Sequence, residues 1–356
     1  MKRKYYYSIN LIRIFVAVIL ACLYHYIVVF GTSPFRFKDI EIILGEFSYI
    51  GVEMFFLISG FVIYGAYAEK ISSGYVSFGA YLKGWIRRIY PMMILSVVFM
   101  AAAQWINYYL YNSYAIMDYY DGRNTLKAFI LSALGLNSGW ICDHDRLSIN
   151  GVTWYISILM ICYCIFFGIN KITKSNKMYN LIGFSLVIVM GMVLLTRPLG
   201  VPLLYTSNAR GYFDFFLGCL IALIYKDLLT DKSRPWLLGF ALVAILAYIG
   251  FYLRNGFNNY ACSLLLNTGL FVLMTNLEIL EHWSDNSFVK YLGKISFPIY
   301  LWNLPVFAVI KLFINIRHVQ LDYSSIITWL VFAIANIFVA IIVQFLLDKC
   351  ERIIRG

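Results

Sequence analysis

Residues 8–30 read SINLIRIFVAVILACLYHYIVVF, an apolar run that is interrupted by Arg13 and His25. A helix needs about 20 apolar residues to cross the hydrocarbon core of a bilayer, so this run is long enough for one crossing. The basic residues in front of it are typical of a signal peptide, but the run is too long and lacks a small-x-small cleavage site. We therefore predict a retained transmembrane helix that carries two ionisable groups.

Similar apolar runs recur along the whole chain of 356 residues. Hydrophobic residues make up 62% of the sequence and charged residues 13%, and the mean hydropathy is +0.75. Soluble domains are nearer half apolar and a quarter charged, so this composition excludes soluble, disordered, fibrous and disulfide-scaffold proteins. The runs predict about ten membrane spans, which lie near residues 8–30, 48–67, 91–111, 152–170, 180–197, 211–226, 236–253, 260–277, 297–315 and 325–347.

The predicted fold is an all-α, polytopic membrane helix bundle, organised as a single domain over residues 1–356 with no fused soluble domain. Loops on the N-terminal side hold about twice as many Lys and Arg residues as loops on the other side, which places both termini in the cytoplasm. The net charge of +11 then reflects loop anchoring rather than nucleic-acid binding. The apolar segment 125–136 is too short to span and predicts a re-entrant or surface helix.

Ionisable groups inside a bilayer are costly and rare, which makes His25 and Glu53 the first site candidates. Glu53 opens the second span, and two antiparallel neighbouring helices would bring it to the depth of His25. A carboxylate that accepts the proton of one imidazole nitrogen leaves the other nitrogen as a base. The two residues therefore predict a general base, His25, oriented by Glu53. The alternative is a buried pair that only ties two helices together.

Three basic residues are candidates for binding an anionic donor that enters from the cytoplasm. Arg13 lies in the inner half of the first span, and Arg87 and Arg88 lie at the cytoplasmic end of the third. Guanidinium groups bind phosphates through paired hydrogen bonds. Each of the three could instead be an anchor at the membrane interface.

Several further polar residues have two interpretations each. Arg210 and Asp214 stand four residues apart at the start of the sixth span, where a structural ion pair is the expected outcome. Asn303 either hydrogen-bonds to a neighbouring helix or contacts the substrate. Trp154 could line a sugar groove. Residues 143–145 read Asp-His-Asp, a spacing too common in polar loops to indicate a metal, and we expect no metal cofactor.

Six motifs occur in one order along the chain. They are Arg13 and His25 in the first span, GVEMFFLISGF at 51–61, RRIYP at 87–91, GVTWYIS at 151–157, RGYFDFFLG at 210–218 and GKISFPIYLWN at 293–303. This ordered set resembles the acyltransferase-3 family of bacterial integral-membrane acyltransferases, of the O-acetyltransferase type, from end to end.

The resemblance implies an enzyme that takes an acetyl or similar short acyl group from cytoplasmic acetyl-CoA. The acceptor would be a hydroxyl of an extracytoplasmic surface polysaccharide or its lipid-linked precursor, and the location the bacterial cytoplasmic membrane. A transporter or flippase of a glycan intermediate or small acid is the alternative, because membrane-embedded charges suit it as well. The family positions match Arg13, His25, Glu53, Ser59, Arg88 and Arg210. Among these Arg210 is a candidate for substrate binding, and the candidate donors to a reacting oxyanion are Asn303, Ser59 and Tyr300.

Three departures from the family pattern bear on the site. Eleven residues separate Arg13 from His25, where the family commonly has one fewer. Either a π-bulge absorbs the extra residue or Arg13 is displaced from its usual role. Leu159 stands where many members have Glu, and Asn303 where many have His. His25 is therefore the only histidine inside a predicted span.

Overall fold

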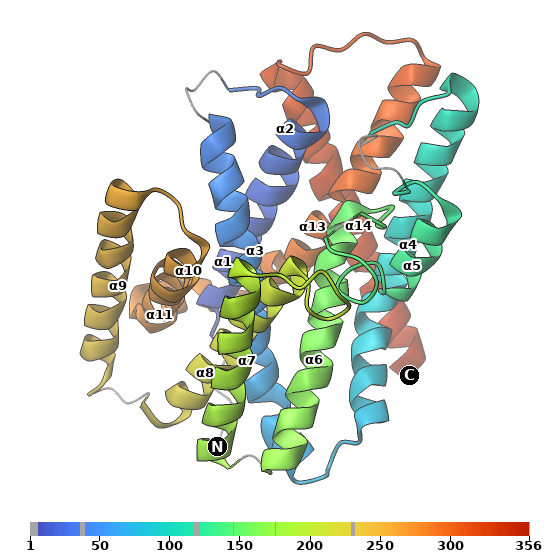
Figure 1. The fold of residues 1–356 in the computed structure, drawn as a ribbon. Coiled ribbons are helices and arrows are strands. Elements are labelled where there is room, and N and C mark those ends of the chain that lie inside the picture. The colour runs from blue at the N-terminus through green and yellow to red at the C-terminus, as the bar shows by residue number, and fades with distance from the viewer. Residues whose placement is uncertain are drawn as a thin grey trace. The chain divides into compact units, whose positions relative to one another are not determined.

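The computed structural model describes residues 6–35, 40–116, 122–144, 146–174, 176–228 and 232–355, and every regular element within them is helical (Figure 1). This confirms the all-helical fold class. The basic residues at positions 2–4, 36 and 38, which contribute to the loop-charge comparison, lie outside the described residues. The cytoplasmic placement of the termini stays a prediction.

The helices and their bounds are as follows: α1 Ser8–Val18, η1 Ile19–Tyr24, α2 His25–Phe30, α3 Ile40–Ser72, α4 Phe78–Tyr111, α5 Leu126–Leu134, η2 Gly151–Thr153, α6 Trp154–Thr173, α7 Lys177–Thr196, α8 Thr206–Leu228, α9 Arg234–Asn255, α10 Asn259–Ala261, η3 Cys262–Asn267, α11 Thr268–Asn276, α12 Glu278–Ser284, α13 Ser287–Ile316 and α14 Ile326–Arg355. η1 and η3 are π-helical and η2 is a 3₁₀ turn.

All ten predicted apolar runs lie in helices, but the number of candidate spans is lower than ten. Within the described residues, eight helices are long and apolar enough to cross a membrane, or nine if a pair bent by 70° at Leu277 is one span. Among the helices that hold the ten predicted spans, α8 is the one outside that count, because Arg210 and Asp214 lower its hydropathy. The crossing of the membrane by α8 therefore stays a prediction.

The short helix that the sequence predicts between the third and fourth spans is α5, nine residues long. Its N-cap is Thr125, whose Oγ1 accepts a hydrogen bond from Ala128 N, and its C-cap is Gly135 in the left-handed conformation. Both signals are ordinary helix caps. A helix of this length cannot span a bilayer, as expected from the sequence.

The chain divides into two compact units. The first comprises Met1–Ile12, Glu46–Lys83 and Ile158–Lys290, and the second comprises Arg13–Gly45, Gly84–Ser157 and Tyr291–Gly356. The expected single-domain organisation stays a prediction.

Glycines set the helix packing of the first unit. A methyl group on Gly60 of α3 would overlap Phe215 O of α8, and one on Gly218 of α8 would overlap Leu57 O of α3. On the other side of α8, a methyl group on Gly191 of α7 would lie 2.8 Å from Phe213 N. Small residues allow helix backbones to approach closely in a membrane, so α8 is held tightly between α3 and α7.

An aromatic cluster packs the second unit near the ends of α2, α13 and α14. Tyr26 Oη donates to Tyr323 O at 2.8 Å, and the ring of Phe30 stacks on Tyr323 with centroids 4.4 Å apart. Lys311 is the lysine within the ninth predicted span, and it donates to Tyr323 Oη at 2.8 Å. The cluster therefore accounts for this in-span cation as a structural group.

Candidate active site

The turn that leads into His25 is a π-helix. Residues Ile19–Tyr24 form η1, and the backbone N–H of His25 donates to Leu20 O, five residues back. A π turn takes up one residue more than an α turn. The structure thus has the first of the two outcomes expected from the spacing of Arg13 and His25, because the extra residue is absorbed between them. π-bulges inside helices occur frequently at functional sites.

The imidazole of His25 is held by an amide. Nδ1 of His25 lies 2.7 Å from Nδ2 of Asn303, which is fully buried on α13. Within the described residues Nε2 of His25 makes no hydrogen bond, and Oδ1 of Asn303 is buried without a partner. An imidazole with one nitrogen fixed presents the other to whatever enters the site.

Aromatic side chains surround this pair. The ring of Tyr300, one turn before Asn303 on α13, lies 6.0 Å from the His25 ring. The ring of Tyr155 meets Tyr300 edge-on at 6.1 Å, and both tyrosines are buried. Three predicted site residues, His25, Tyr300 and Asn303, therefore share one polar site within the second unit.

Glu53 forms a two-point ion pair with Arg210. Arg210 Nε donates to Glu53 Oε1 at 2.6 Å and Arg210 Nη2 donates to Oε2 at 2.8 Å. The guanidinium also lies over the ring of Tyr49, 4.3 Å from its centroid. Glu53 and Arg210 are only 4% and 7% exposed, so this two-point ion pair is a buried feature of the first unit.

This ion pair bears on two sequence predictions. The bidentate partner of Arg210 is Glu53, 157 residues away, and its expected pairing with Asp214 on its own helix stays a prediction. His25 belongs to the second unit and Glu53 to the first, so the pairing of these two residues stays a prediction. The partner that the structure gives to His25 Nδ1 is Asn303.

A second carboxyl lies beside the ion pair in the first unit. Asp214 of α8 is 1% exposed, hydrogen-bonds to Ser263 of η3 and has no partner for its Oδ1 among the described residues. In η3 as well, Asn267 Nδ2 donates to Ile50 O at 3.3 Å. Each of the two π-helices of the described chain therefore adjoins a buried polar cluster.

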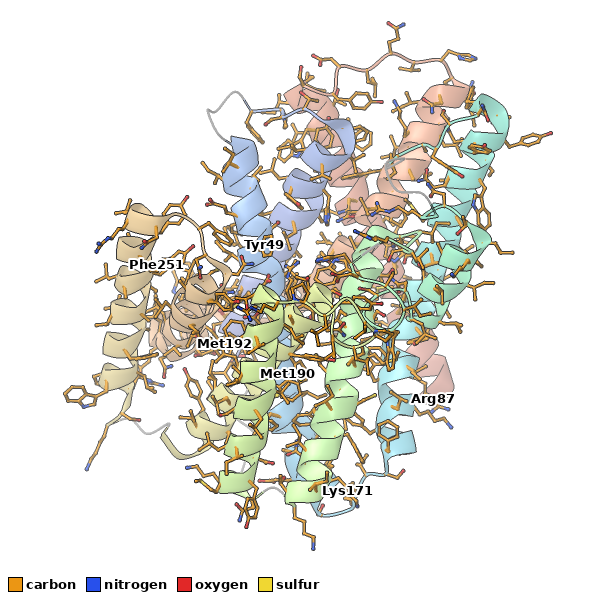
Figure 2. The ribbon with its side chains drawn as sticks, viewed as in Figure 1. Tyr49, Arg87, Lys171, Met190, Met192 and Phe251 are labelled. Atoms are coloured by element: carbon orange, nitrogen blue, oxygen red, sulfur yellow. The ribbon has the colours of Figure 1, made fainter. Side chains whose placement is uncertain are left out.

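The remaining predicted site residues have varied surroundings. Arg87 and Arg88 are exposed on α4, and Figure 2 shows Arg87 projecting outward from that helix. Arg13 on α1 and Ser59 on α3 are half-buried. Trp154 begins α6, with its ring 5.7 Å from that of His144. The roles of these five residues stay predictions.

Three side chains that the sequence analysis missed reach the backbone around His25 and Asn303. Trp329 Nε1 donates to Cys22 O in η1 at 2.6 Å, and Asn336 Nδ2 donates to Ile299 O in α13 at 3.1 Å. Asn150 Nδ2 donates to Leu301 O at 3.1 Å. Leu301 is four residues before Pro305, which has no N–H to offer it. Pro305 and the lone Asn336 in its span were the available signals.

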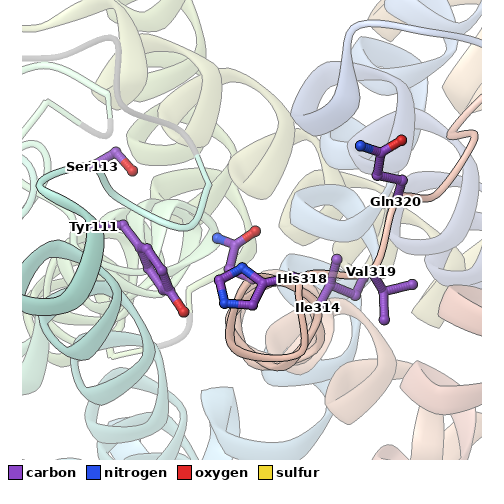
Figure 3. A pocket seen from close by; sticks show the side chains of 7 residues that line it. Tyr111, Ser113, Ile314, His318, Val319 and Gln320 are labelled. Atoms are coloured by element: carbon purple, nitrogen blue, oxygen red, sulfur yellow. The ribbon is translucent and has the colours of Figure 1, made fainter.

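A pocket of about 410 Å³ opens between the C-terminal ends of α4 and α13 (Figure 3). The rings of Tyr111 and His318 meet edge-on across it, with centroids 6.5 Å apart. Asn315 donates to Asn107 Oδ1 at 2.7 Å, which fixes its amide at the pocket. The other lining residues are Ser113, Ile314, Val319 and Gln320. The pocket thus combines aromatic faces with amide and hydroxyl groups.

Comparison with known proteins assigns the chain to a family. Residues 6–345 match the acyltransferase-3 family, described as an acyltransferase domain. A segment of 55 residues is 42% identical to "Protein 2 in picA locus" of Rhizobium radiobacter, and it covers 15% of this chain and 29% of that protein. The chain therefore spans less than a third of that relative, and no solved structure matches it significantly. Because the family match extends over nearly the whole chain, this multi-pass membrane protein belongs to the acyltransferase-3 family.

Proposed function

We propose that this protein moves an acetyl or similar short acyl group from cytoplasmic acyl-CoA to a hydroxyl of an extracytoplasmic polysaccharide or its lipid-linked precursor. It would act in a bacterial cytoplasmic membrane with both termini in the cytoplasm. Membership of the family supports acyl transfer within a bilayer. The observation that carries the proposal is the contact of His25 Nδ1 with Asn303, because it leaves Nε2 available inside an apolar bundle.

In this proposal His25 Nε2 is the general base. Nε2 carries a lone pair only when the proton of the neutral ring is on Nδ1, which then needs an acceptor. The Asn303 amide supplies one when its oxygen faces Nδ1, and a half-turn of the amide exchanges its NH₂ and its oxygen. This orientation also gives a partner to Asn303 Oδ1, which otherwise has none among the described residues.

The transfer step balances without a cofactor. Nε2 takes the proton of the acceptor hydroxyl while that oxygen bonds to the thioester carbonyl carbon. The tetrahedral intermediate then loses the C–S bond, and the imidazolium returns the proton to the departing thiolate, which yields the ester and CoA. A positioned base of this kind contributes roughly 10²–10⁴-fold to the rate.

An amide orienting group has a chemical consequence. A carboxylate partner would stabilise the imidazolium, whereas a neutral amide fixes the tautomer without adding a charge. The developing oxyanion then needs its own donor. Tyr300, with its ring 6.0 Å from that of His25, is the best-placed of the residues that the sequence suggested.

Donor binding is assigned to Arg13, Arg87 and Arg88. All three belong to the second unit, which also holds His25. Arg87 and Arg88 are exposed, so their guanidinium groups are accessible to the phosphates of CoA. Arg210 was a further candidate for substrate binding. Its Nε and Nη2 are engaged by Glu53, which favours a structural role for it.

The pocket between α4 and α13 is a candidate docking site for the acceptor. Asn112 and His318 adopt φ angles of 51° and 52°, so left-handed residues follow the C-terminal ends of both helices beside the pocket. Helix C-termini carry partial negative charge, which favours hydroxyl donors over phosphate. A neutral saccharide suits this pocket better than the head group of CoA does.

The test follows labelled acetyl-CoA with purified protein in liposomes, with and without crude cell-surface glycan. We expect label to move to the glycan, His25→Ala to abolish transfer, and the exposed-site control His282→Ala to behave as wild type. Transfer by His25→Ala at the wild-type rate would remove the base assignment. Absence of CoA release with every acceptor would instead favour transport, to be measured as flux of a labelled glycan precursor.

A further inference from the structure

The helical run that carries His25 is bonded to α14 by a side chain. In η1 the backbone hydrogen bonds reach five residues back instead of four, as the bond from His25 N–H to Leu20 O demonstrates. Two carbonyls further on, Cys22 O accepts from the indole Nε1 of Trp329 at 2.6 Å. An indole N–H donates only, so this bond has one direction and one geometry. Trp329 therefore fixes the π turn that immediately precedes His25.

The same face of α14 reaches the helix that carries Asn303. Asn336 follows Trp329 by seven residues, or about two helical turns, and so lies on the same face. Its Nδ2 donates to Ile299 O of α13 at 3.1 Å and lies 3.7 Å from Cys22 Sγ of η1. Asn336 is fully buried, within an apolar helix. One face of α14 thus contacts α13, which carries Asn303, and η1, which immediately precedes His25.

α13 is held from a second direction as well. Pro305 leaves Leu301 O without its helical donor, and Asn150 Nδ2 fills that position at 3.1 Å. Asn150 Nδ2 also bonds Ser96 Oγ of α4 at 3.1 Å. All these bonds lie within the second unit. Those from Trp329, Asn336 and Asn150 end on backbone carbonyls of η1 or α13, and Asn150 is itself bonded to Ser96 of α4. They therefore set the registers of the two helices rather than the rotamer of one side chain.

We propose that Trp329 and Asn336 are positioning residues, which hold η1 and α13 in the register that keeps the His25 imidazole on Asn303. This inference rests on the proposed role of His25 as the base. Among the described residues neither side chain hydrogen-bonds to the imidazole, so both act through the backbone. A displacement of about 1 Å at a reacting group can cost up to 10²-fold in rate, which gives these remote bonds a catalytic consequence.

The experiment compares Trp329→Phe and Asn336→Ala with a matched control, Trp105→Phe. Trp105 Nε1 donates to Asn124 O at 2.8 Å, so the control loses a bond of the same kind elsewhere in the second unit. The chain has four histidines, and ¹⁵N-histidine NMR in micelles therefore resolves each imidazole, with His25 identified by its loss in His25→Ala. Nitrogen shifts report which ring nitrogen carries the proton.

We expect wild type and Trp105→Phe to show His25 as one tautomer. Trp329→Phe and Asn336→Ala should each convert this signal to an exchanging mixture, with kcat about 10–100-fold lower and the KM for acetyl-CoA unchanged. Asn336→Gln, which keeps the donor, should recover part of the loss. An unaltered His25 signal and kcat in both variants would overturn the proposal. If His25→Ala stays active while the tautomer still shifts in Trp329→Phe, the positioning stands and the base assignment fails.

Discussion

Glu53 and Arg210 lie 157 residues apart in the sequence and form a buried ion pair with two hydrogen bonds, of 2.6 and 2.8 Å. Glu53 comes from α3 and Arg210 from α8, two helices that approach closely through Gly60 and Gly218. The pair therefore lies on the same two helices as this close approach, about two helical turns from it. Glu53 and Arg210 each belong to a family motif. Their ion pair gives them a structural function that does not depend on bound substrate.

Removal of one member of this pair should destabilise the protein. Glu53→Ala or Arg210→Ala leaves a buried charge without its bidentate partner, and breaking a buried pair costs roughly 3–5 kcal/mol in proteins. The double variant Glu53→Leu with Arg210→Met should lose less than the sum of the two single changes. The unfolding midpoint in detergent micelles measures all of these, and additive losses would contradict a coupled pair.

The same double variant tests the pairing of His25 with Glu53. If Glu53 only stabilises α3 and α8, the double variant should transfer acetyl groups at a rate within about tenfold of wild type, once it is corrected for folded protein. A folded but inactive double variant would support a role for Glu53 at the reaction centre. Labelled acetyl-CoA turnover in liposomes is the measurement.

The close approach of α3 and α8 predicts a sharp glycine requirement. Gly60→Ala or Gly218→Ala would place a methyl group against a backbone carbonyl of the facing helix, and such overpacking costs about 1–3 kcal/mol or more. Gly65→Ala, on the same helix with open space around it, is the matched control and should be neutral or slightly stabilising. Equal unfolding midpoints for Gly60→Ala and Gly65→Ala would refute the packing argument.

The π turn of η1 predicts unequal effects of deletion and insertion. Deletion of Ala21 removes the residue that the π turn absorbs, so the run should become regular α-helix and keep His25 near its present face. Insertion of an alanine after Ala21 rotates His25 by about 100° relative to Arg13. We expect the deletion variant to retain measurable transfer and the insertion variant to lose it, with similar amounts in the membrane by immunoblotting. The reverse order of activities would contradict this account.

The pocket at the ends of α4 and α13 predicts an effect on acceptor binding alone. Tyr111→Ala removes an aromatic wall and should raise the acceptor KM about tenfold, which corresponds to about 1.4 kcal/mol of binding free energy. The KM for acetyl-CoA should not change. Tyr109→Ala is the control, because Tyr109 is 87% exposed on the same helix and does not line the pocket. An unchanged acceptor KM in Tyr111→Ala would place acceptor docking elsewhere.

The helices were predictable because hydropathy is a property of consecutive residues. The ten apolar runs coincide with helices, and the nine-residue α5 was expected from a segment too short to span. Even the π turn of η1 was one of two stated outcomes, because an extra residue between Arg13 and His25 must be absorbed or must rotate the helix. The predicted span at α8 is outside the candidates found by helix length and hydropathy, because Arg210 and Asp214 reduce its hydropathy, and its crossing stays a prediction.

The sequence by itself also identified which polar residues are exceptional, since an ionisable group within an apolar run stands out without any knowledge of its neighbours. Partners are different, because they depend on which helices are adjacent and in what register. Local spacing pointed Arg210 to Asp214, and only the packing of α3 on α8 gave it to Glu53. Likewise the sequence offered no partner for Asn303, whose Nδ2 lies 2.7 Å from His25 Nδ1 in the tertiary structure. A hydrogen bond needs two groups within about 3 Å, and only the tertiary structure brings together residues that lie hundreds of positions apart.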